Sequence, residues 1–405
     1  MSELHVRGFR AGAVAAGIKY MERLDLGMIW SDTPAHAAAM FTRNDVKAAP
    51  VIDGMNKLLH NRENMRGIVV NSGNANACTG PVGIRDVTEV AGLAAEKAGC
   101  RPEDLFVAST GVIGLPLPME RFRQAVPGLA DTLSENGFND VADAILTTDT
   151  VRKTAFRKFQ AGGVEIRMAG MAKGAGMIGP DMGVPSATML AFIITDAPVE
   201  ADWWQDALVR AVDASFNSII VDGDTSTNDT VIALANGMAT GRPGTQTATD
   251  PDMKKKVCQA LSDISMELAR QIVMDGEGAT KCVDVTVSGA VSKEDADRAA
   301  RTIACSPLVK TAFFGNDPNW GRILAAAGRA GINMNPEGAD LYIGDVMVAS
   351  DGKGAGGDAE KRAAAIMRGR EFAIRLDLNM GDESATVITT DLSDEYVHIN
   401  ADYRT

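Results

Sequence analysis

Residues 171–197 read MAKGAGMIGPDMGVPSATMLAFIITDA and join a glycine-rich loop directly to a strongly apolar run. Lys173 opens the loop, and the pair Ala187–Thr188 ends it. The run from Met189 to Ile194 is apolar throughout, which predicts a buried β-strand. Thr188 is therefore expected where a polar loop meets a rigid core strand.

Apolar runs of this kind alternate with helical patterns along the chain, which favours an α/β fold. Three other short runs predict buried strands, over 67–70, 105–108 and 218–221. Apolar residues spaced three and four apart predict helices over 119–133, 202–212 and 257–272. Asp202 is the expected N-cap of the second helix. Polar and apolar residues alternate over 394–400, which predicts a half-buried strand that would hold the C-terminus.

Composition excludes several classes of function. The 405 residues are 45% hydrophobic and carry a net charge of −13, so a globular core is expected and general nucleic-acid binding is not. No apolar stretch is long enough to cross a membrane, and the N-terminus lacks a signal peptide. The five dispersed cysteines fit a cytoplasmic protein, and the four scattered histidines give no metal-binding spacing. We therefore expect no bound metal and no membrane or nucleic-acid partner.

Thr188 offers a nucleophile that needs no histidine. If the Ala187–Thr188 bond breaks, Thr188 gains a free α-amine beside its own hydroxyl. Such an amine has an ordinary pKa of about 7.7–8.0, so it can accept the hydroxyl proton near neutral pH. The simpler interpretation, a β-branched residue that begins a strand, is the more frequent one for a segment of this kind.

Other polar clusters follow the expected strands and helices in a fixed order. They are 71–80 (NSGNANACTG), 109–114 (STGVIG), 222–229 (DGDTSTND), 275–281 (DGEGATK), 315–322 (GNDPNWGR) and 399–405 (INADYRT). With the Ala-Thr-Met-Leu core at 187–190, these motifs resemble the ornithine acetyltransferase family, also called bifunctional glutamate N-acetyltransferase, of arginine biosynthesis. The resemblance extends from Gly8 to Thr405.

The resemblance implies an α/β fold of two stacked β-sheets flanked by helices. It also implies self-cleavage between Ala187 and Thr188 into chains 1–187 and 188–405, which assemble as a heterotetramer. Thr188 would carry the acetyl group from N-acetylornithine to glutamate, with acetyl-CoA as a further candidate donor and no resident cofactor. Thr110 and Gly111 would form the oxyanion hole. The implied substrate contacts are Thr147, Lys173, Thr188, Glu277, Asn400 and Thr405.

One feature departs from the family pattern. The chain has four more residues between Lys173 and Thr188 than is usual, because Gly183 to Ser186 interrupt the expected Pro-Asn-Met-Ala-Thr. The loop must bulge if Lys173 is to keep its place.

Three alternatives remain open at the level of sequence. An amidohydrolase with the same nucleophile would release the acyl group to water. A metabolite-binding protein would use the same loops without cleavage. Asp222 and Asp224 have the Asp-x-Asp spacing of magnesium-dependent phosphatases, although this short pattern also fits a polar turn.

Overall fold

The computed structural model describes residues 4–179, 189–241 and 250–401. The chain divides into two compact units. Unit 1 comprises Met1–Asn217 and Asp224–Ile272, and unit 2 comprises Ser218–Gly223 and Val273–Thr405. Unit 1 contains residues from both sides of the expected cleavage point, so the division into chains 1–187 and 188–405 stays a prediction about the covalent chain.

Unit 1 is built on two β-sheets that share one long strand. The strands of the first sheet are β1 (Phe9–Val14), β2 (Leu26–Phe41), β3 (Met65–Asn71) and β4 (Leu105–Ser109). The other strands of the second sheet are β9 (Thr230–Ala235), β7 (Leu190–Thr195), β6 (Val164–Lys173) and β5 (Lys153–Ala161). The first half of β2 pairs with β1 and β3, and its second half pairs with β9. Its register with β3 shifts between Trp30 and Ala35, where the strand passes from one sheet to the other.

Apolar side chains from both sheets form one core between them. Phe106 and Ile68 of the first sheet belong to the same buried cluster as Phe192 and Ile232 of the second. Strands buried on both faces read as continuous apolar runs, which explains why the sequence of β7 predicts its strand so clearly. Full burial of a side chain such as that of Phe192 contributes about 1.5–3 kcal/mol.

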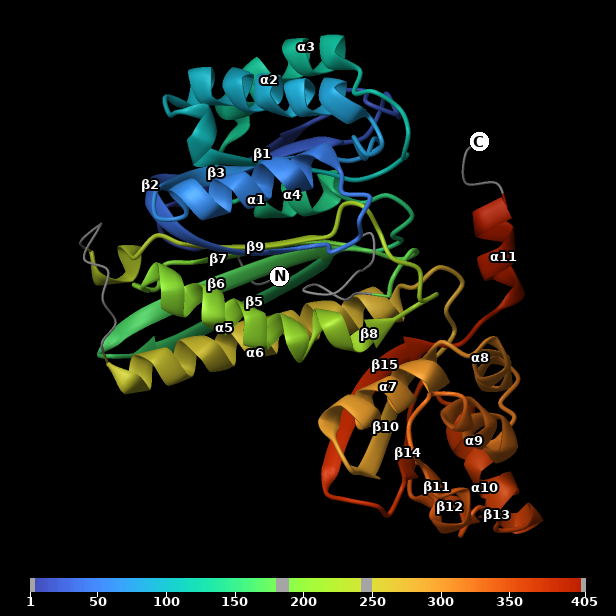
Figure 1. Cartoon of the computed structure of the whole chain (residues 1–405). Helices are drawn as coiled ribbons and strands as arrows, with labels where there is room; N and C mark the ends of the chain where they lie inside the picture. The colour runs from blue at the N-terminus through green and yellow to red at the C-terminus, as the bar shows by residue number, and fades with distance from the viewer. Residues whose placement is uncertain (1–3, 180–188, 242–249, 402–405) are drawn as a thin grey trace. The chain divides into compact units, whose positions relative to one another are not determined.

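Helices cover the outer faces of both sheets, as Figure 1 shows. The helices α2 (Gly80–Ala98) and α3 (Met119–Leu129) pack on the first sheet, through a cluster that contains Val87, Phe122 and Val107. On the second sheet lie α5 (Ala201–Asp213) and α6 (Pro251–Met274). A Cβ atom at Gly170 of β6 would lie 2.7 Å from the side chain of Ile264 of α6, so the helix approaches the sheet closely. The predicted fold of two stacked sheets between helices is therefore present within unit 1.

Two of the remaining helices of unit 1 contact the core between the sheets, through Leu58 and Val141 respectively. They are α1 (Ala49–Asn61) and α4 (Phe138–Ala144), with the short 3-10 helices η1 (Pro102–Asp104), η2 (Ala130–Thr132), η3 (Phe216–Ser218) and η4 (Met238–Thr240). Two predicted details are corrected here. Helix α5 begins at Ala201 with Glu200 as its N-cap, so Asp202 lies in the first turn. The helix expected over 119–133 ends at Leu129, because the 3-10 turn η2 follows.

Unit 2 has a mixed seven-stranded sheet of its own, which sequence patterns did not predict as a separate sheet. In order across the sheet its strands are β13 (Lys353–Gly354), β12 (Val346–Ser350), β11 (Asp340–Ile343), β14 (Glu371–Asp377), β10 (Cys282–Ala290), β15 (Glu383–Thr390) and β8 (Ile219–Ile220). Its helices are α7 (Lys293–Ala304), α8 (Pro307–Phe314), α9 (Trp320–Gly328), α10 (Gly357–Met367) and α11 (Asp394–Ala401), with the 3-10 helix η5 (Pro336–Gly338). The side chain of Ser292 caps α7 by accepting the Asp295 amide, and the helix buries Ala299 and Ile303 against the core.

Candidate functional site

A buried lysine–hydroxyl contact lies in unit 1. Lys173, the last residue of β6, is only 2% exposed, and Thr110, directly after β4, is fully buried. The Nζ atom of Lys173 donates a hydrogen bond to Oγ1 of Thr110 at 3.4 Å. The structure thus brings together two predicted site residues that are 63 positions apart in the chain.

Asp149 organises the polar groups around this contact. Its Oδ1 atom accepts hydrogen bonds from Lys153 Nζ at 2.7 Å and from the Gly174 amide at 2.6 Å. Its Oδ2 atom accepts the Thr147 amide at 3.1 Å and lies 3.9 Å from Nζ of Lys173. Burial alone would raise the pKa of Asp149, but the charges of Lys173 and Lys153 outweigh it and lower that pKa to about 2. Asp149 is therefore a carboxylate that fixes two buried lysines and the chain at Thr147.

The loop after β4 gives the expected oxyanion site its shape. The Thr110 amide donates to the Asn71 carbonyl at 3.0 Å, which leaves the hydroxyl as the group that Thr110 can offer to a ligand. Gly111 has a φ of +132°, and a Cβ atom there would lie 2.3 Å from the carbonyl carbon of Gly73. Only glycine fits such a backbone, and its small size lets two loops meet at this point.

The chain enters β7 beside these residues. Ala187 and Thr188 lie outside the described residues, and Met189 is the first described residue after them. Lys173 pairs with Leu190 across the β6–β7 ladder. Lys173 is therefore in register with the start of β7, and β7 begins two positions after Thr188 in the sequence.

Asp229 was not predicted as a site residue, but it touches the same strand entry. Its Oδ1 atom accepts the Met189 amide at 2.7 Å, and the residue is fully buried. Complete burial raises the pKa of Asp229 well above its ordinary value, although the amide of Met189, the charge of Lys173 and the nearby Ser226 hydroxyl oppose this. The neighbouring Asn228 donates to the carbonyls of Ala75 and Ser109 and so ties β9 to the Thr110 loop.

Unit 2 brings together a second pair of predicted site residues. The amide Nδ2 of Asn400 donates to Oε2 of Glu277 at 2.8 Å, and Glu277 is 8% exposed. Asp391 holds the loop that follows Glu277, because its Oδ1 atom accepts the amides of Thr280 and Lys281. A carboxylate held in this way can bind a cationic amine. Thr405 lies outside the described residues.

The predicted strand over 394–400 is wrong, because this segment forms the helix α11. Acidic residues in its first turn favour a helix, since they face the positive end of the helix dipole. The helix places Tyr396 and Asn400 one turn apart. The hydroxyl of Tyr396 donates to Asp222 at 3.2 Å, and Nδ2 of Asn400 donates to the Tyr396 carbonyl as well as to Glu277. A helix, not a strand, therefore carries Asn400.

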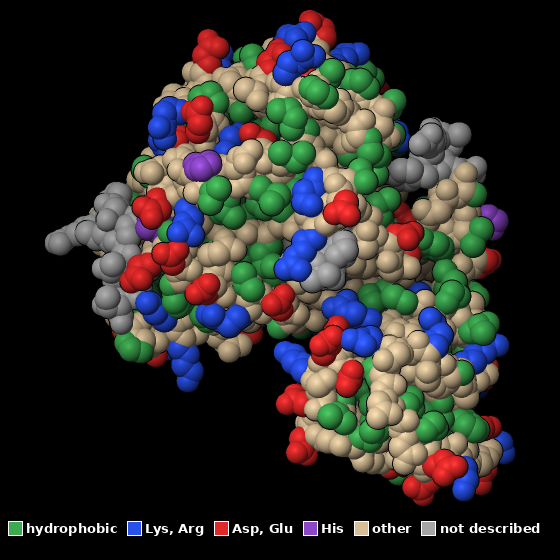
Figure 2. Space-filling view, viewed as in Figure 1, with side chains coloured by type: hydrophobic (Ala, Val, Ile, Leu, Met, Phe, Trp, Pro, Cys, Tyr) green, Lys and Arg blue, Asp and Glu red, His purple; other side chains and the backbone are tan. Residues whose placement is uncertain are grey.

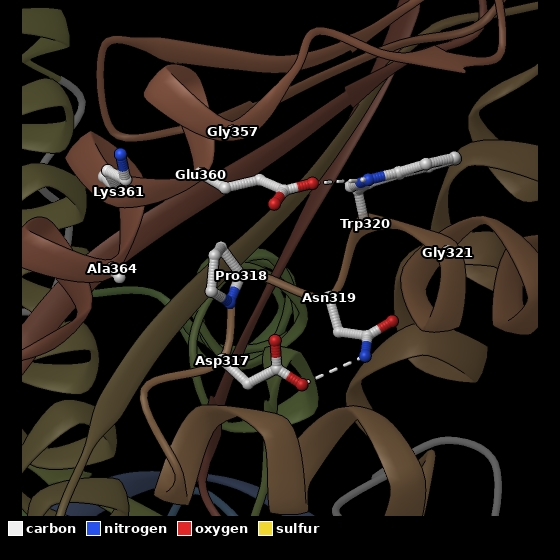
Figure 3. A pocket seen from close by; sticks show the side chains of 9 residues that line it. All are labelled: Asp317, Pro318, Asn319, Trp320, Gly321, Gly357, Glu360, Lys361 and Ala364. Carbon is white, nitrogen blue, oxygen red and sulfur yellow. Dashed lines mark hydrogen bonds between the residues drawn. The ribbon is translucent and has the colours of Figure 1, made fainter.

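Other features of the described residues are separate from these two sites. A cavity of about 620 Å³ in unit 2 lies between the first turns of α9 and α10. It is lined by Asp317, Pro318, Asn319, Trp320, Gly321, Gly357, Glu360, Lys361 and Ala364 (Figure 3). Its polar side chains bond to one another, since the Trp320 indole donates to Glu360 and the Asn319 amide donates to Asp317. None of the predicted site residues that the structure describes lines this cavity.

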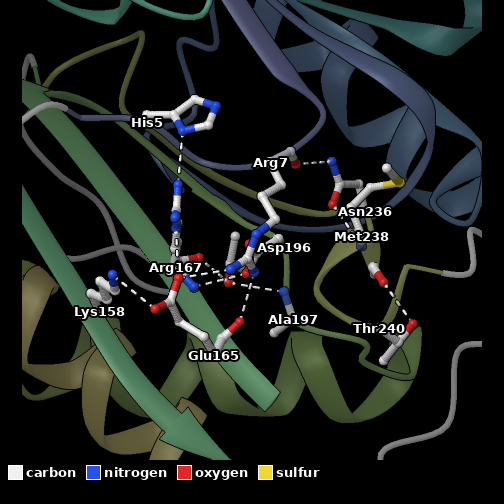
Figure 4. A network of polar contacts seen from close by, with 12 residues as sticks. His5, Arg7, Lys158, Glu165, Arg167, Asp196, Ala197, Asn236, Met238 and Thr240 are labelled. Carbon is white, nitrogen blue, oxygen red and sulfur yellow. Dashed lines mark hydrogen bonds and ion pairs between the residues drawn. The ribbon is translucent and has the colours of Figure 1, made fainter.

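A second polar network fastens the N-terminal segment to β6 and β7 (Figure 4). Arg7 donates to Glu165 and to Asp196, and the Asp196 carboxylate also accepts the Arg167 amide. Burial raises the pKa of Asp196 to about 6, against the charges of both arginines and its hydrogen bonds. Asp196 directly follows β7, whereas Met189 precedes it, so this network belongs to the opposite end of the strand.

The visible surface carries charged side chains of both signs. Figure 2 shows acidic and basic side chains interspersed on the visible face, without a continuous basic stripe. Within the described ranges, no helix is long and apolar enough to cross a membrane. The cysteines are free thiols, and the same ranges hold no group of three or more potential metal ligands.

The fold and the polar site in unit 1 define a two-sheet α/β protein with buried charge at the entry to a core strand. The profile of the ArgJ family matches residues 10–405. The arginine biosynthesis bifunctional protein ArgJ of Geobacter sulfurreducens is 51% identical over 402 residues, which cover 99% of this chain and all of that protein. The protein of the same name from Desulfotalea psychrophila is 46% identical over 404 residues, which cover 99% of this chain and 100% of that protein.

Two solved structures are also similar to this chain. The arginine biosynthesis bifunctional protein ArgJ of Bacillus halodurans is 37% identical, with a TM-score of 0.47, and the match covers 51% of this chain and 95% of that one. An ornithine acetyltransferase of Mycobacterium tuberculosis, solved with ornithine, is 35% identical, with a TM-score of 0.40. The match covers 45% of this chain and 97% of that one. From the family profile and the full-length relatives, the chain belongs to the ArgJ family.

Proposed function

We propose that this chain is a glutamate N-acetyltransferase that moves an acetyl group from N-acetylornithine to glutamate through an acetyl-Thr188 intermediate, in the biosynthesis of arginine. Membership of the ArgJ family supports this, as does the Ala-Thr-Met-Leu core at 187–190. The structural observation that carries the proposal is the buried contact between Lys173 and Thr110. Lys173 is the last residue of β6 and pairs with Leu190 at the start of β7.

The proposed reaction starts with self-cleavage between Ala187 and Thr188. The new α-amine of Thr188 takes the proton of its hydroxyl as the oxygen attacks the acetyl carbonyl. Negative charge then develops on the carbonyl oxygen, and the Thr110 hydroxyl and the Gly111 amide are the proposed donors to it. Because Lys173 donates to Oγ1 of Thr110, the Thr110 hydrogen is directed to another acceptor and is polarised by the lysine charge.

Two groups of residues are the proposed substrate contacts. Glu277 and Asn400 would hold the cationic side-chain amine of ornithine, since Asn400 orients the Glu277 carboxylate. Lys173 would attract a substrate carboxylate, and Thr147 is held close to it by Asp149. Thr405 is included on the basis of the family resemblance alone.

The proposal also includes a second acetyl donor, an assembly of the cleaved chains and a cellular location. Acetyl-CoA serves as a second acetyl donor, which agrees with the word bifunctional in the names of the relatives. The two cleaved chains assemble as a heterotetramer, without a resident cofactor. The enzyme acts in the cytoplasm, where free thiols persist.

A single assay separates the transferase from the alternative amidohydrolase. Purified protein is supplied with N-acetylornithine, with and without glutamate, and both N-acetylglutamate and free acetate are measured. A transferase forms N-acetylglutamate at the rate of ornithine release, whereas an amidohydrolase forms acetate at a rate that glutamate does not change. The same assay with acetyl-CoA in place of N-acetylornithine tests the second donor.

A further inference from the structure

A buried lysine of unit 2 has no part in the chemistry described so far. Lys310 of α8 is 3% exposed, and its Nζ atom donates hydrogen bonds to Oγ1 of Thr389 at 3.0 Å and to Oγ1 of Thr390 at 2.9 Å. It also donates to the Thr390 carbonyl. Burial lowers the pKa of Lys310 to about 8, against nearby acidic groups of which Asp391 has the largest effect. The side chain is therefore mainly an ammonium at pH 7, and its three hydrogens match the three contacts.

The two threonine hydroxyls extend this network to neighbouring elements. Oγ1 of Thr389 donates to the Ala304 carbonyl at 3.2 Å, at the end of α7. Oγ1 of Thr390 donates to the Val221 carbonyl at 3.4 Å, directly after β8. Each hydroxyl thus accepts from the lysine and passes its own hydrogen to a main-chain oxygen. A buried network in which every donor and acceptor is used in this way holds its members rigidly.

Lys310 holds the chain on both sides of Asp391. Its ammonium group binds Thr390, the last residue of β15, and its carbonyl oxygen accepts the Leu392 amide at 3.2 Å. Asp391 lies between these two residues and is itself buried. The position of the Asp391 carboxylate therefore depends on contacts that α8 makes through one residue.

The segment that Lys310 holds is the one that fixes the loop after Glu277. Oδ1 of Asp391 accepts the Thr280 amide at 2.8 Å. Oγ of Ser393 donates to the Gly278 carbonyl at 2.6 Å, one residue after Glu277. The contacts thus run from the ammonium of α8, through residues 389–393, to the main chain beside the Glu277 carboxylate.

We infer that Lys310 is a positioning residue for the Glu277 carboxylate and thereby determines the preference of the enzyme for an acetyl donor with a cationic side chain. This inference rests on the proposed function and deepens it, since Glu277 is the proposed contact to the side-chain amine of ornithine. Lys310 does not touch the substrate. Without its ammonium group, residues 389–393 lose their attachment to α8, and the Glu277 loop loses its fixed position. A carboxylate that is displaced by even a small distance binds an amine less well.

The test is the kinetics of Lys310→Met, which keeps a side chain of similar length without the ammonium group. Double-displacement kinetics give a separate kcat/KM for the donor N-acetylornithine and for the acceptor glutamate. We expect the value for N-acetylornithine to fall about tenfold or more. The value for glutamate should stay at the wild-type level, because glutamate has no side-chain amine. A merely structural defect reduces the amount of active enzyme and lowers both values by the same factor.

Val309→Ala is the matched control on the same helix. Val309 is fully buried next to Lys310 in the chain, so the substitution weakens the packing of α8. It removes no hydrogen bond to residues 389–393. The ratio of kcat/KM for N-acetylornithine to kcat/KM for glutamate should stay at the wild-type value in this variant.

Two variants at Thr390 decide the matter if Lys310→Met does not fold, as judged by its thermal unfolding. Thr390→Val keeps the shape of the side chain but removes one of the three acceptors of Lys310. We expect it to lower the same ratio about threefold or more. Thr390→Ser keeps the hydroxyl and should retain the wild-type ratio.

The outcomes separate this inference from the proposed function. Folded Lys310→Met protein with the wild-type ratio overturns the role of Lys310 and leaves the proposed function intact. Thr390→Val protein with the wild-type ratio does the same where Lys310→Met does not fold. Wild-type protein that forms no N-acetylglutamate from N-acetylornithine contradicts the proposed function, and the role of Lys310 falls with it.

Discussion

The Nζ atom of Lys173 lies 3.4 Å from the Oγ1 atom of Thr110, and neither residue is more than 2% exposed. A lysine is rarely buried so fully unless a partner holds it, and here Asp149 compensates its charge at 3.9 Å. In the proposed reaction, this arrangement would place the positive charge of Lys173 behind the Thr110 hydroxyl as an acyl oxygen becomes negative. The predicted effect of substitutions at Thr110 depends on this contact.

Removal of the Thr110 hydroxyl should reduce turnover more than substrate binding. We expect Thr110→Ala to lower kcat about 100-fold to 1000-fold, with a small change in KM, because an oxyanion contact strengthens in the transition state. Thr110→Ser should keep most of the activity. Thr311→Ala removes a threonine hydroxyl on the exposed surface of α8 and serves as the control. A rise in KM with unchanged kcat would assign Thr110 to ground-state binding instead.

Gly111 should tolerate no side chain. Gly111→Ala places a Cβ atom 2.3 Å from the carbonyl carbon of Gly73, in addition to the strain of φ +132°. Gly114→Ala in the same loop carries a similar strain, with φ +90°, but meets no atom within 4 Å. We expect Gly111→Ala to lower the thermal unfolding midpoint clearly more than Gly114→Ala, and to abolish transfer. Equal midpoints for the two variants would show that the loops are free to separate.

Helix α11 should contribute to substrate binding rather than to self-cleavage. Asn400→Ala removes the hydrogen bond to Glu277, and a bond to a charged group contributes about 1.5–3 kcal/mol. We therefore expect kcat/KM for N-acetylornithine to fall tenfold or more, at about 1.4 kcal/mol for each factor of ten. Deletion of Ala401–Thr405 should weaken binding similarly and leave cleavage intact. Val397→Ala changes an exposed residue of the same helix and should have no effect.

The raised pKa of Asp196 predicts that the folded protein becomes more stable as pH falls. Its pKa is raised to about 6, so between about pH 6 and pH 4 the folded protein binds a proton that the unfolded chain does not. The free energy of unfolding should increase over this window, by at most about 3 kcal/mol for a pKa raised from 3.8 to about 6. Denaturant titrations of wild type and Asp196→Asn measure the difference. Asp32→Asn, at an exposed pair with Arg10, should keep the wild-type slope.

Much of the fold was predictable where one apolar pattern dominates a segment. The strands expected at 67–70, 105–108 and 189–194 correspond to β3, β4 and β7, because each is buried on both faces. The alternation of polar and apolar residues over 394–400 predicted a strand, but the segment is a helix. The pattern is short, and the two acidic residues at its start favour the first turn of a helix. The sheet of unit 2 was not foreseen, since its strands pair residues far apart in sequence.

The candidate site was predictable only in part. Thr110, Thr147 and Lys173 were expected from the family resemblance, and the structure brings them to one polar cluster around Asp149. Asp149 and Lys153 are four positions apart in the run TTDTVRK, a spacing that could have indicated an ion pair. Asp229 gives no comparable local signal, because its contact with Met189 depends on the pairing of β7 with β9.

The most direct test of the account is the mass of the chain that begins at Thr188 after brief exposure to N-acetylornithine without glutamate. The account predicts two fragments, 1–187 and 188–405, with one acetyl group added to the second fragment at Thr188 and lost when glutamate is added. Thr188→Ala should stay a single chain without acetylation. An intact chain that transfers acetyl groups, or an acetyl group on any other residue, would contradict the central claim.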